Sequence, residues 1–379
     1  MKVRLGDYIQ EYSVKNKDDE NISVYSVTNT KGFCKDYFGK EVASKDKTTY
    51  KIVPYGYFAY NPSRINVGSV DWQRKEKKVI VSPLYNVFSV SPNLERQYLY
   101  YYLKSDFVLQ RIKAVATGSV RDNLKLSMLY EFPIELPKLE NQRKIVKILD
   151  KVSDVVEKKE QELEQLETLV KSRFAEMFGD IGTGIFNFGT CKLGDVARVG
   201  SSHRVFTTEF VESGIPFYRG TEIGELANGQ KPSEPYCISE EHYERLANDD
   251  TKPLIGDLLM PSICNKGQVW MVDTEEPFYY KDGRVLCISP DRRVFNSKFL
   301  QYFMREKTLV EYPKMGSGST FAEFKIFLLK NMDVLIPPRE IQEQFAAFVH
   351  QVDKSKSKIQ KSLEETQLLF DSLMQKYFG

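Results

Sequence analysis

The sequence predicts an α+β protein in which two similar globular domains are joined by two long helices forming an antiparallel coiled coil, with an internal pseudo-two-fold axis. Three observations predict it: a duplicated series of short motifs, a helical repeat after each copy, and a length of 379 residues, which suits more than one domain. The duplicated motifs, each given with its copy, are Leu5-Gly6-Asp7 and Leu193-Gly194-Asp195, Gly118-Ser119 and Gly318-Ser319, Leu136-Pro137 and Ile336-Pro337, and Phe178-Gly179 and Phe378-Gly379. From the Gly-Ser pair onward the copies lie 200 residues apart, and such a duplication is typical of a molecule with an internal two-fold.

The composition is that of a globular protein, with 41% hydrophobic and 28% charged residues. The sequence reaches a charge and a glycine too early for a secretory leader, and no apolar run approaches the roughly 20 residues of a membrane helix. Five scattered cysteines without a CxxC pair favour neither a disulfide framework nor a zinc site. We therefore expect a cytoplasmic protein without a metal site.

The net charge of +2 is small, and it is distributed unevenly. Residues 1–137 hold 21 basic and 15 acidic side chains, whereas residues 181–336 hold 18 and 21. Proteins that bind nucleic acid usually have a clearer basic excess. Binding to DNA would therefore depend on local patches and on partner proteins.

The first globular domain is expected at residues 1–137. Strands are predicted at 79–81 and 86–90, and a helix at 94–115. The tyrosine run at 98–102 falls inside this helix, which favours packing in the core over stacking on bases. A linker at 181–190 leads to the second domain at 191–336, with a strand at 284–288 and a helix at 297–312.

Spacer helices are expected at 138–180 and 337–379, where apolar residues recur in steps of three and four. About 38 residues at 1.5 Å per residue would give each a length of roughly 57 Å. One alternative is that each helix packs on its own globular domain; the matched seams favour pairing of the helices with each other. Lys159 interrupts the first seam where Ile359 completes the second, and a polar residue inside a seam can fix the register of a helix pair. The predicted seam residues are Ile145, Ile148, Val152, Val155, Leu163, Leu166 and Val170 on the first helix, and Phe345, Phe348, Val352, Ile359, Leu363, Phe370 and Leu373 on the second.

Several polar loops combine the side chains that DNA-binding proteins use. Arg and Lys can bind guanine, Asn and Gln can bind adenine, and hydroxyl and backbone N–H groups suit phosphate oxygens. The alternative for each loop is an ordinary polar turn. The candidate DNA-contacting residues are Asn61, Arg64, Asn66, Ser69, Ser119 and Arg121 in the first domain, and Tyr218, Arg219, Asn265, Lys266, Gln268, Ser317 and Ser319 in the second.

With these motifs in this order, the chain resembles the specificity (S) subunit of Type I restriction–modification enzymes. The resemblance rests on the paired Leu-Gly-Asp openings, the Gly-Ser segments that lead into Leu136-Pro137 and Ile336-Pro337, the glutamines Gln142 and Gln342, and the terminal Phe-Gly pairs. The segment 256–260, Gly-Asp-Leu-Leu-Met, also looks like that family. In that family a Glu-Gln pair is familiar at the start of each long helix. This chain departs from the pattern, with Asn-Gln at 141–142 and Ile-Gln at 341–342.

This resemblance implies a non-catalytic subunit that reads a bipartite sequence in double-stranded DNA, one half-site per target-recognition domain, with the helices setting the gap. It also implies recruitment of two methylation (M) subunits, which would bind S-adenosylmethionine, and of restriction (R) subunits. No cofactor is expected on this chain itself. A molecule about 57 Å long matches roughly 17 base pairs at 3.4 Å each, which suits two separated half-sites.

Two other functions remain as alternatives. Near-neutral charge favours a coiled-coil scaffold that binds only proteins. A nuclease is suggested by Asp291, Glu323 and Lys325, yet the acids are absent at Asn93 and Asn123 in the other half. The loop at 61–64, Asn-Pro-Ser-Arg, lacks the second proline and the aromatic residue of amino-methyltransferases, and no glycine-rich turn follows a strand.

Overall fold

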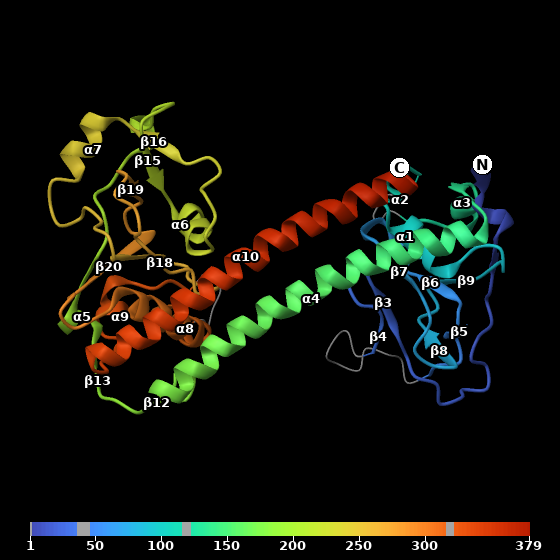
Figure 1. The fold of residues 1–379 in the computed structure, drawn as a ribbon, viewed down its shortest axis with the longest axis horizontal. Helices are drawn as coiled ribbons and strands as arrows, with labels where there is room; N and C mark the ends of the chain where they lie inside the picture. Colours follow the sequence, from blue (N-terminus) through green and yellow to red (C-terminus); the bar gives the residue numbers. More distant parts are fainter. Residues whose placement is uncertain (1, 36–45, 116–122, 316–321) are drawn as a thin grey trace. The chain divides into compact units, whose positions relative to one another are not determined.

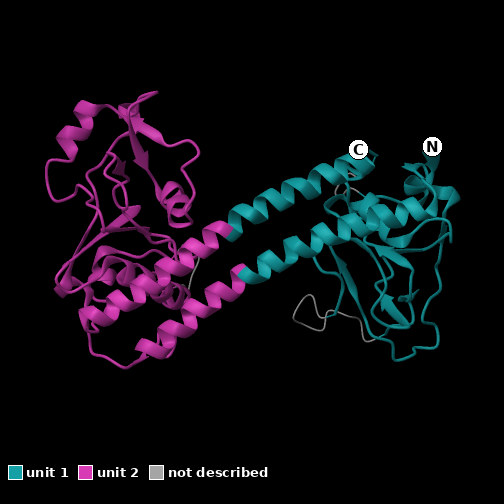
Figure 2. Cartoon of the chain, in the orientation of Figure 1, with its two compact units in different colours: residues 1–162, 359–379 teal, residues 163–358 magenta. Residues whose placement is uncertain are grey.

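The computed structural model describes residues 2–35, 46–115, 123–315 and 322–379. The chain forms two compact units, coloured separately in Figure 2: unit 1 is Met1–Glu162 with Ile359–Gly379, and unit 2 is Leu163–Lys358. Each unit therefore holds one globular part and a portion of both long helices, α4 (Leu139–Phe178) and α10 (Arg339–Phe378). No helix in the described residues is long and apolar enough to cross a membrane.

Unit 1 is built on a four-stranded antiparallel sheet in the order β2-β9-β6-β7 (Figure 1). Three two-stranded pairs accompany it, β1 with β10, β3 with β4 and β5 with β8. The strands are β1 (Lys2–Arg4), β2 (Ile9–Glu11), β3 (Ser26–Thr28), β4 (Gly32–Cys34), β5 (Lys51–Pro54), β6 (Phe58–Tyr60), β7 (Val70–Trp72), β8 (Lys78–Val81), β9 (Asn86–Val90) and β10 (Pro133–Glu135). The shorter helices are η1 (Leu5–Asp7), η2 (Ile65–Val67), α1 (Arg96–Lys104), α2 (Asp106–Val115) and α3 (Leu126–Tyr130).

Unit 2 repeats this plan with the sheet β14-β20-β17-β18 and the pair β13 with β21. It adds the sheet β16-β15-β19 and two helices, α6 and α7, for which the described residues of unit 1 have no counterpart. The strands are β11 (Gly179–Asp180), β12 (Ile185–Phe186), β13 (Thr190–Lys192), β14 (Ala197–Gly200), β15 (Ile215–Tyr218), β16 (Tyr236–Ile238), β17 (Leu258–Pro261), β18 (Trp270–Met271), β19 (Tyr279–Tyr280), β20 (Val285–Pro290) and β21 (Asp333–Leu335). The shorter helices are α5 (Leu193–Val196), η3 (Thr207–Glu209), α6 (Gly220–Ala227), α7 (Glu240–Leu246), α8 (Ser297–Glu311), η4 (Tyr312–Met315) and α9 (Ile326–Lys330).

The helix predicted at 94–115 is two helices that meet at Ser105. The Ser105 Oγ donates to the carbonyl of Tyr102 (2.7 Å) and accepts from the N–H of Val108 (3.4 Å), so one hydroxyl ends α1 and caps α2. The tyrosine run lies in the core as predicted. Tyr98 and Tyr102 are buried, and their hydroxyls donate to the carbonyls of β10.

A buried glutamine fixes the start of α4 in unit 1. The side chain of Gln142 is fully buried, and its Oε1 accepts from the N–H of Glu95 at 2.8 Å. Its Nε2 donates to the carbonyls of Asn93 (3.0 Å) and Pro137 (2.9 Å). Glu95 is the residue that caps α1, so one amide joins the beginning of the long helix to the beginning of the domain helix.

The same arrangement occurs in unit 2. Gln342 is fully buried; its Oε1 accepts from the N–H of Asn296 at 2.9 Å, and its Nε2 donates to the carbonyls of Val294 and Pro337, both at 2.9 Å. Asn296 is the N-cap of α8. Only an amide has the acceptor and the two donors that these positions use, because a carboxylate cannot donate.

The long helices pair antiparallel in each unit. In unit 1 the start of α4, with Leu149, shares a core with Met374 and Phe378 at the end of α10. In unit 2 the end of α4, with Phe174, shares a core with Phe345 at the start of α10. Both cores also include the globular part, so each helix packs on its partner helix and on a domain.

Two of the predicted seam residues are exposed. Ile148 is 42% exposed and Val155 is 41% exposed, whereas Leu149, which the seam prediction omitted, is fully buried. Near its start, α4 packs against the domain core as well as against α10. The face of the helix that carries Leu149 is therefore the buried one. A helix with 3.6 residues per turn also drifts away from a strict 3.5-residue repeat.

Lys159 crosses from one long helix to the other. Its Nζ donates to the carbonyl of Ser362 (2.9 Å), to the hydroxyl of the same residue, and to the Oγ1 of Thr366 (2.9 Å). The positions equivalent to Lys159 and Thr366 are Ile359 and Leu166, which are both apolar. Lys159 and Thr366 therefore both stand where the other copy of the repeat has an apolar residue.

We predict that Gln342→Leu destabilises unit 2. The substitution leaves the N–H of Asn296 and the carbonyls of Val294 and Pro337, which are buried or partly buried, without partners, and this should cost about 2–4 kcal/mol of unfolding free energy. Gln344→Leu, an exposed position on the same helix, is the matched control and should change it little. Urea unfolding followed by circular dichroism measures both, and equal effects of the two variants would contradict the structural role of Gln342.

We also predict coupling between Lys159 and Thr366. Lys159→Ile alone places an apolar side chain against two hydroxyls, and adding Thr366→Leu gives both positions the apolar residue types of their copies, Ile359 and Leu166. A double-mutant cycle should give a favourable coupling of about 1 kcal/mol. Lys158→Ile, on the exposed side, should show no coupling with Thr366→Leu; a cycle in which Lys159 also shows none would refute the pairing.

Candidate nucleic-acid interface

The loop at 61–69 joins β6 to β7 in unit 1 and is closed by its own hydrogen bonds. The Asn61 Oδ1 accepts from the N–H of Ser63 (3.1 Å) and from its hydroxyl (2.9 Å). The N–H of Ser69 donates to the carbonyl of Arg64 (3.2 Å), and Gly68 has a φ of 84°, a conformation that favours glycine. Asn61 and the buried Ser69 therefore hold the loop, while the half-buried Asn66 has no side-chain hydrogen bond to another described residue.

Arg64 is the charged residue that this loop presents to solvent. It is exposed, and its guanidinium forms no hydrogen bond or ion pair with any described residue. Unpaired arginine is available for bidentate binding to a base edge or to a phosphate.

The loop at 262–269 joins β17 to β18 and occupies the same place in the repeated sheet of unit 2. Asn265 and Lys266 are exposed, and the Gln268 Oε1 accepts from the N–H of Lys266 at 3.0 Å. Gln268 thus stabilises its own loop by a hydrogen bond, as Asn61 does in the loop at 61–69. Lys266 is the exposed cation of this loop, as Arg64 is of the loop at 61–69.

One backbone hydrogen bond ties each loop to a second predicted segment. The N–H of Leu124 donates to the carbonyl of Pro62 (3.1 Å), and the N–H of Phe324 donates to the carbonyl of Ser262 (2.7 Å). The predicted residues of those segments, Ser119 and Arg121 in one and Ser317 and Ser319 in the other, lie outside the described residues. Directly after the donor residues Leu124 and Phe324, the chain continues with Lys125 and Lys325.

Sequence reasoning did not include Lys125 and Lys325 among the candidate DNA contacts. Both are exposed next to the loops, and neither forms a hydrogen bond or ion pair with a described residue. The signal that could have found them is their constant spacing of 200 residues, which the repeat displays.

Tyr218 and Arg219 are largely occupied by contacts within unit 2. The Tyr218 ring lies 5.1 Å from that of Phe278, and burial raises the pKa of its hydroxyl. The Arg219 guanidinium binds Glu222 at 2.5 Å and lies 4.5 Å from the centre of the Tyr236 ring. These residues precede α6, which packs against β17 and β18 beside the loop at 262–269.

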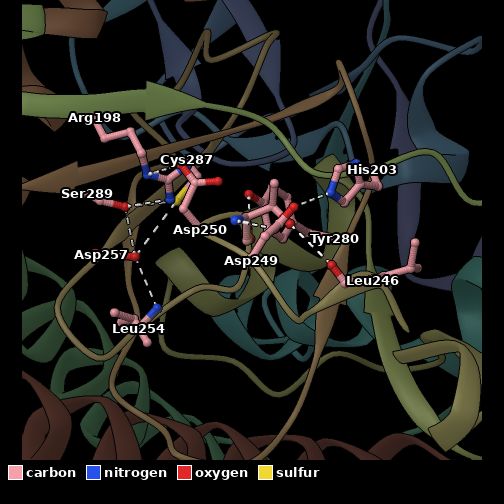
Figure 3. A network of polar contacts seen from close by, with 11 residues as sticks. Arg198, His203, Leu246, Asp249, Asp250, Leu254, Asp257, Tyr280, Cys287 and Ser289 are labelled. Carbon is pink, nitrogen blue, oxygen red and sulfur yellow. Dashed lines mark hydrogen bonds and ion pairs between the residues drawn. The ribbon is translucent and has the colours of Figure 1, made fainter. Parts of the chain in front are cut away.

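A polar network holds the strand that carries this loop, as Figure 3 shows. Asp257 is buried just before β17, and its carboxylate accepts from the N–H of Leu254 (3.0 Å) and the hydroxyl of Ser289 (3.0 Å). It also accepts from the guanidinium of Arg292 at 2.7 Å. Gly256 has a φ of 82°, a conformation that favours glycine and that turns the chain here. The hydrogen bonds of Asp257 then hold this turn in place.

The same region carries a histidine–carboxylate pair. The His203 Nε2 lies 2.7 Å from the Oδ2 of Asp249 (Figure 3). Hydrogen bonds from His203 and from the N–H and hydroxyl of Thr251 lower the pKa of Asp249 to about 2. The pair fixes the chain before Asp257.

The described residues contain no group of three or more His, Cys, Asp or Glu side chains that could hold a metal ion. Glu323 is paired with Arg284, and Asp291 with Arg293, so the acids of the suggested nuclease pattern are engaged elsewhere. The polar groups of the loops suit binding rather than proton transfer or metal chemistry.

Fold and site define a class: a duplicated recognition protein, in which two copies of one α+β unit each present a polar loop and each continue into a 40-residue helix. The family described as the Type I restriction modification DNA specificity domain matches residues 3–168 and again residues 187–366. The chain belongs to this family, with two copies of its domain, and the predicted resemblance to specificity subunits is confirmed.

Curated relatives agree with this assignment. The chain is 26% identical over 283 residues to a type I restriction enzyme specificity subunit of Haemophilus influenzae, covering 73% of this chain and 69% of the relative. It is 24% identical over 307 residues to the type I restriction enzyme MjaIX specificity subunit of Methanocaldococcus jannaschii, covering 74% and 67%.

Solved structures share the fold over the whole chain. The S subunit of the Type I restriction–modification system from M. genitalium has a TM-score of 0.58 at 15% identity and covers 100% of this chain and 96% of its own. A structure described under complex assembly and conformational transition of the type I R-M system has a TM-score of 0.56 at 19% identity and covers 100% and 97%. The predicted fold class is thereby confirmed.

We predict that Arg64→Ala relaxes sequence choice at one base pair of a DNA target. Loss of a bidentate contact to guanine should cost about 1–3 kcal/mol for the preferred base and little for the other bases. Binding to a panel of duplexes that differ at single positions measures this. Lys77→Ala, at an exposed position outside the loop, is the control. A loss that is uniform across sequences would make Arg64 a phosphate contact instead.

Proposed function

We propose that this chain is the DNA-recognition subunit of a Type I restriction–modification complex and reads a bipartite target, with one half-site bound by each unit. The observation that carries the proposal is the repeated anchoring of the two loops. In each unit the same backbone hydrogen bond joins the β6–β7 or β17–β18 loop to the segment before Lys125 or Lys325. Each loop then presents one exposed cation, Arg64 or Lys266, beside amide side chains.

The two long helices would set the gap between the half-sites. Both run without a break through 40 residues, which at 1.5 Å per residue gives about 60 Å each. Buried Gln142 and Gln342 fix each domain to the start of a helix, so a change in helix length would be transmitted to the domain. A spacer of constant length suits a target with a fixed gap.

We further propose that the chemistry belongs to partner proteins. In this scheme the chain is not itself an enzyme and carries no cofactor; two methylation subunits bind S-adenosylmethionine, and restriction subunits cut DNA. The pairing of Glu323 with Arg284 supports this, because it leaves that acid without a metal-binding neighbour among the described residues. The complex would work in the cytoplasm, where its DNA target lies.

A protein-binding scaffold without DNA specificity is the second candidate, favoured by the net charge of only +2. Mapping methylated bases across the genome separates the two. The chain is expressed with its candidate methylation subunit in a host that lacks other methylation. A two-part motif with a fixed gap and one methylated adenine per strand supports DNA reading. No modification by a complex that assembles and binds S-adenosylmethionine supports the scaffold.

We predict that lengthening both helices lengthens the gap. Four residues inserted after Glu162 on α4 and four after Lys358 on α10 add about 6 Å, which is near two base pairs at 3.4 Å each. The methylated motif should keep both half-sites and gain about two base pairs between them. Four residues inserted after Thr183, in a loop, are the control and should leave the gap unchanged; an unchanged gap in the helix variant would refute the spacer role.

A further inference from the structure

Tyr60 is a fully buried tyrosine at the end of β6, directly before the loop at 61–69. Its hydroxyl donates to the carbonyl of Leu124 at 3.1 Å and accepts from the Nδ2 of Asn86, opposite it on β9, at 2.9 Å. Because the amide donates to the hydroxyl oxygen, the single hydroxyl proton is left for Leu124. Burial raises the pKa of this hydroxyl above its usual value, so the donor stays protonated.

This bond is the second one that holds the backbone of Leu124. The N–H of Leu124 donates to the carbonyl of Pro62 in the loop at 3.1 Å, and the Leu124 side chain is fully buried. The carbonyl bonded to Tyr60 belongs to the peptide group that joins Leu124 to Lys125. Both backbone groups of Leu124 are therefore fixed to β6 and its loop, and the exposed Lys125 begins from this fixed point.

Unit 2 keeps one of these two bonds and lacks the other. The backbone N–H of Phe324 is bonded to the loop at 262–269, but its carbonyl accepts no hydrogen bond from any residue that the structure describes. The residues in the places of Tyr60 and Asn86 are Met260 and Leu286, which face each other in the same register on β17 and β20. Neither of these side chains can donate a hydrogen bond.

The repeated sheet therefore does not need a polar pair at this place. Met260 is fully buried and Leu286 is 2% exposed, so an apolar pair fills the position in unit 2. Burying a hydroxyl and an amide has a desolvation cost that the apolar pair avoids. What unit 1 gains in return is the bond to Leu124, and that bond serves the exposed residues on either side, Asn123 and Lys125.

We propose that Tyr60 is a positioning residue for DNA reading by unit 1: it holds Lys125 at a fixed place relative to Arg64, so that a phosphate contact of the lysine and a base contact of the arginine form together. A lysine bound to phosphate fixes the register of a protein on a duplex, and an arginine bound to a base edge supplies the choice of sequence. Tyr60 is fully buried and so touches no DNA itself. The inference rests on the proposed function and deepens it.

Loss of the hydroxyl should loosen this register. The carbonyl of Leu124 would be left buried without a partner, and the chain would relieve that cost by shifting the carbonyl toward water. Lys125 would shift with it. Arg64 would then meet its base correctly in fewer of the bound molecules, so discrimination between sequences would fall, while the attraction of the cations for phosphates would remain.

The test measures initial methylation rates of the full chain assembled with its candidate methylation subunit. The substrates are duplexes that carry the mapped two-part motif or single-base departures from it in either half-site. Tyr60→Phe should raise the rate on departures in one half-site, relative to the intact motif, about tenfold. The other half-site should stay as stringent as in the wild type. Relaxation of both half-sites, or of neither, would overturn the proposal.

Two control variants separate positioning from a loss of stability. The buried Tyr102 hydroxyl also donates to a backbone carbonyl, that of Pro133 at 2.7 Å, so Tyr102→Phe removes the same kind of bond away from the loop. Met260→Leu is a volume-conserving change at the equivalent place in unit 2. Both should leave discrimination unchanged. If Tyr102→Phe relaxes a half-site as strongly as Tyr60→Phe does, the effect is one of stability and the positioning role is wrong.

Asn86 allows a second test, which a packing role would not reproduce. Asn86→Asp places an acceptor where the amide donated, so the carboxylate takes the hydroxyl proton and the bond to Leu124 is lost. Discrimination should fall as in Tyr60→Phe, and the double variant should fall no further. Asn86→Leu leaves the Tyr60 hydroxyl free to donate to Leu124 and should relax the half-site much less. Equal relaxation by the aspartate and the leucine would contradict the role of this bond.

Failure of this inference is distinguishable from failure of the proposed function. If the wild-type complex assembles and binds S-adenosylmethionine yet methylates no two-part motif, the DNA-reading function is wrong and this inference falls with it. If the wild type methylates such a motif and Tyr60→Phe relaxes neither half-site, only the role of Tyr60 is wrong.

Discussion

The buried glutamine at the start of each long helix is the constraint on which the rest of the structure depends. Gln142 and Gln342 each join three segments that are separate in sequence: the proline-containing entrance, the start of the long helix, and the residues that begin α1 or α8. Each amide is fully buried and fully bonded, so moving the domain on its helix would leave buried polar groups unpaired. The loops at 61–69 and 262–269 depend on this joint for their position, because they connect strands of the sheets against which α1 and α8 pack.

The glutamine joint is the same in both copies of the repeat, whereas residues elsewhere on the long helices differ between the copies. Lys159 hydrogen-bonds across the helix pair where its copy, Ile359, is apolar, and the partner position changes with it from Thr366 to Leu166. A lysine without the threonine would keep only its hydrogen bonds to Ser362, and a threonine without the lysine would lose this donor. Similarly, Ile145 and Phe345 occupy equivalent positions, yet one borders a hollow and the other completes an aromatic core. The repeated backbone therefore carries an asymmetric surface.

Sequence alone predicted those parts of the fold that depend on local repetition. Helices predicted at 138–180 and 337–379 are present at 139–178 and 339–378, because a long apolar repeat, an entrance proline and a terminal Phe-Gly act within the segment itself. The break at Ser105 escaped prediction, since a serine inside a helical pattern caps a new helix only when the chain around it bends. The exposure of Ile148 and Val155 escaped it too: which side of α4 is buried depends on Leu149 meeting a domain core that no local pattern reveals.

The candidate interface also combines features that the sequence predicted with features that it did not predict. The sequence predicted that the loops at 61–69 and 262–269 correspond. The use of Asn61 and Gln268 to shape their own loops, and of Arg219 to bind Glu222, depends on contacts that only the folded chain makes. What the two loops share is a bond between backbone atoms, from Leu124 to Pro62 and from Phe324 to Ser262. A backbone bond does not depend on the side chains of either partner. The residues presented by each loop can therefore change while its anchor stays, which is what a domain that reads different sequences on one scaffold requires.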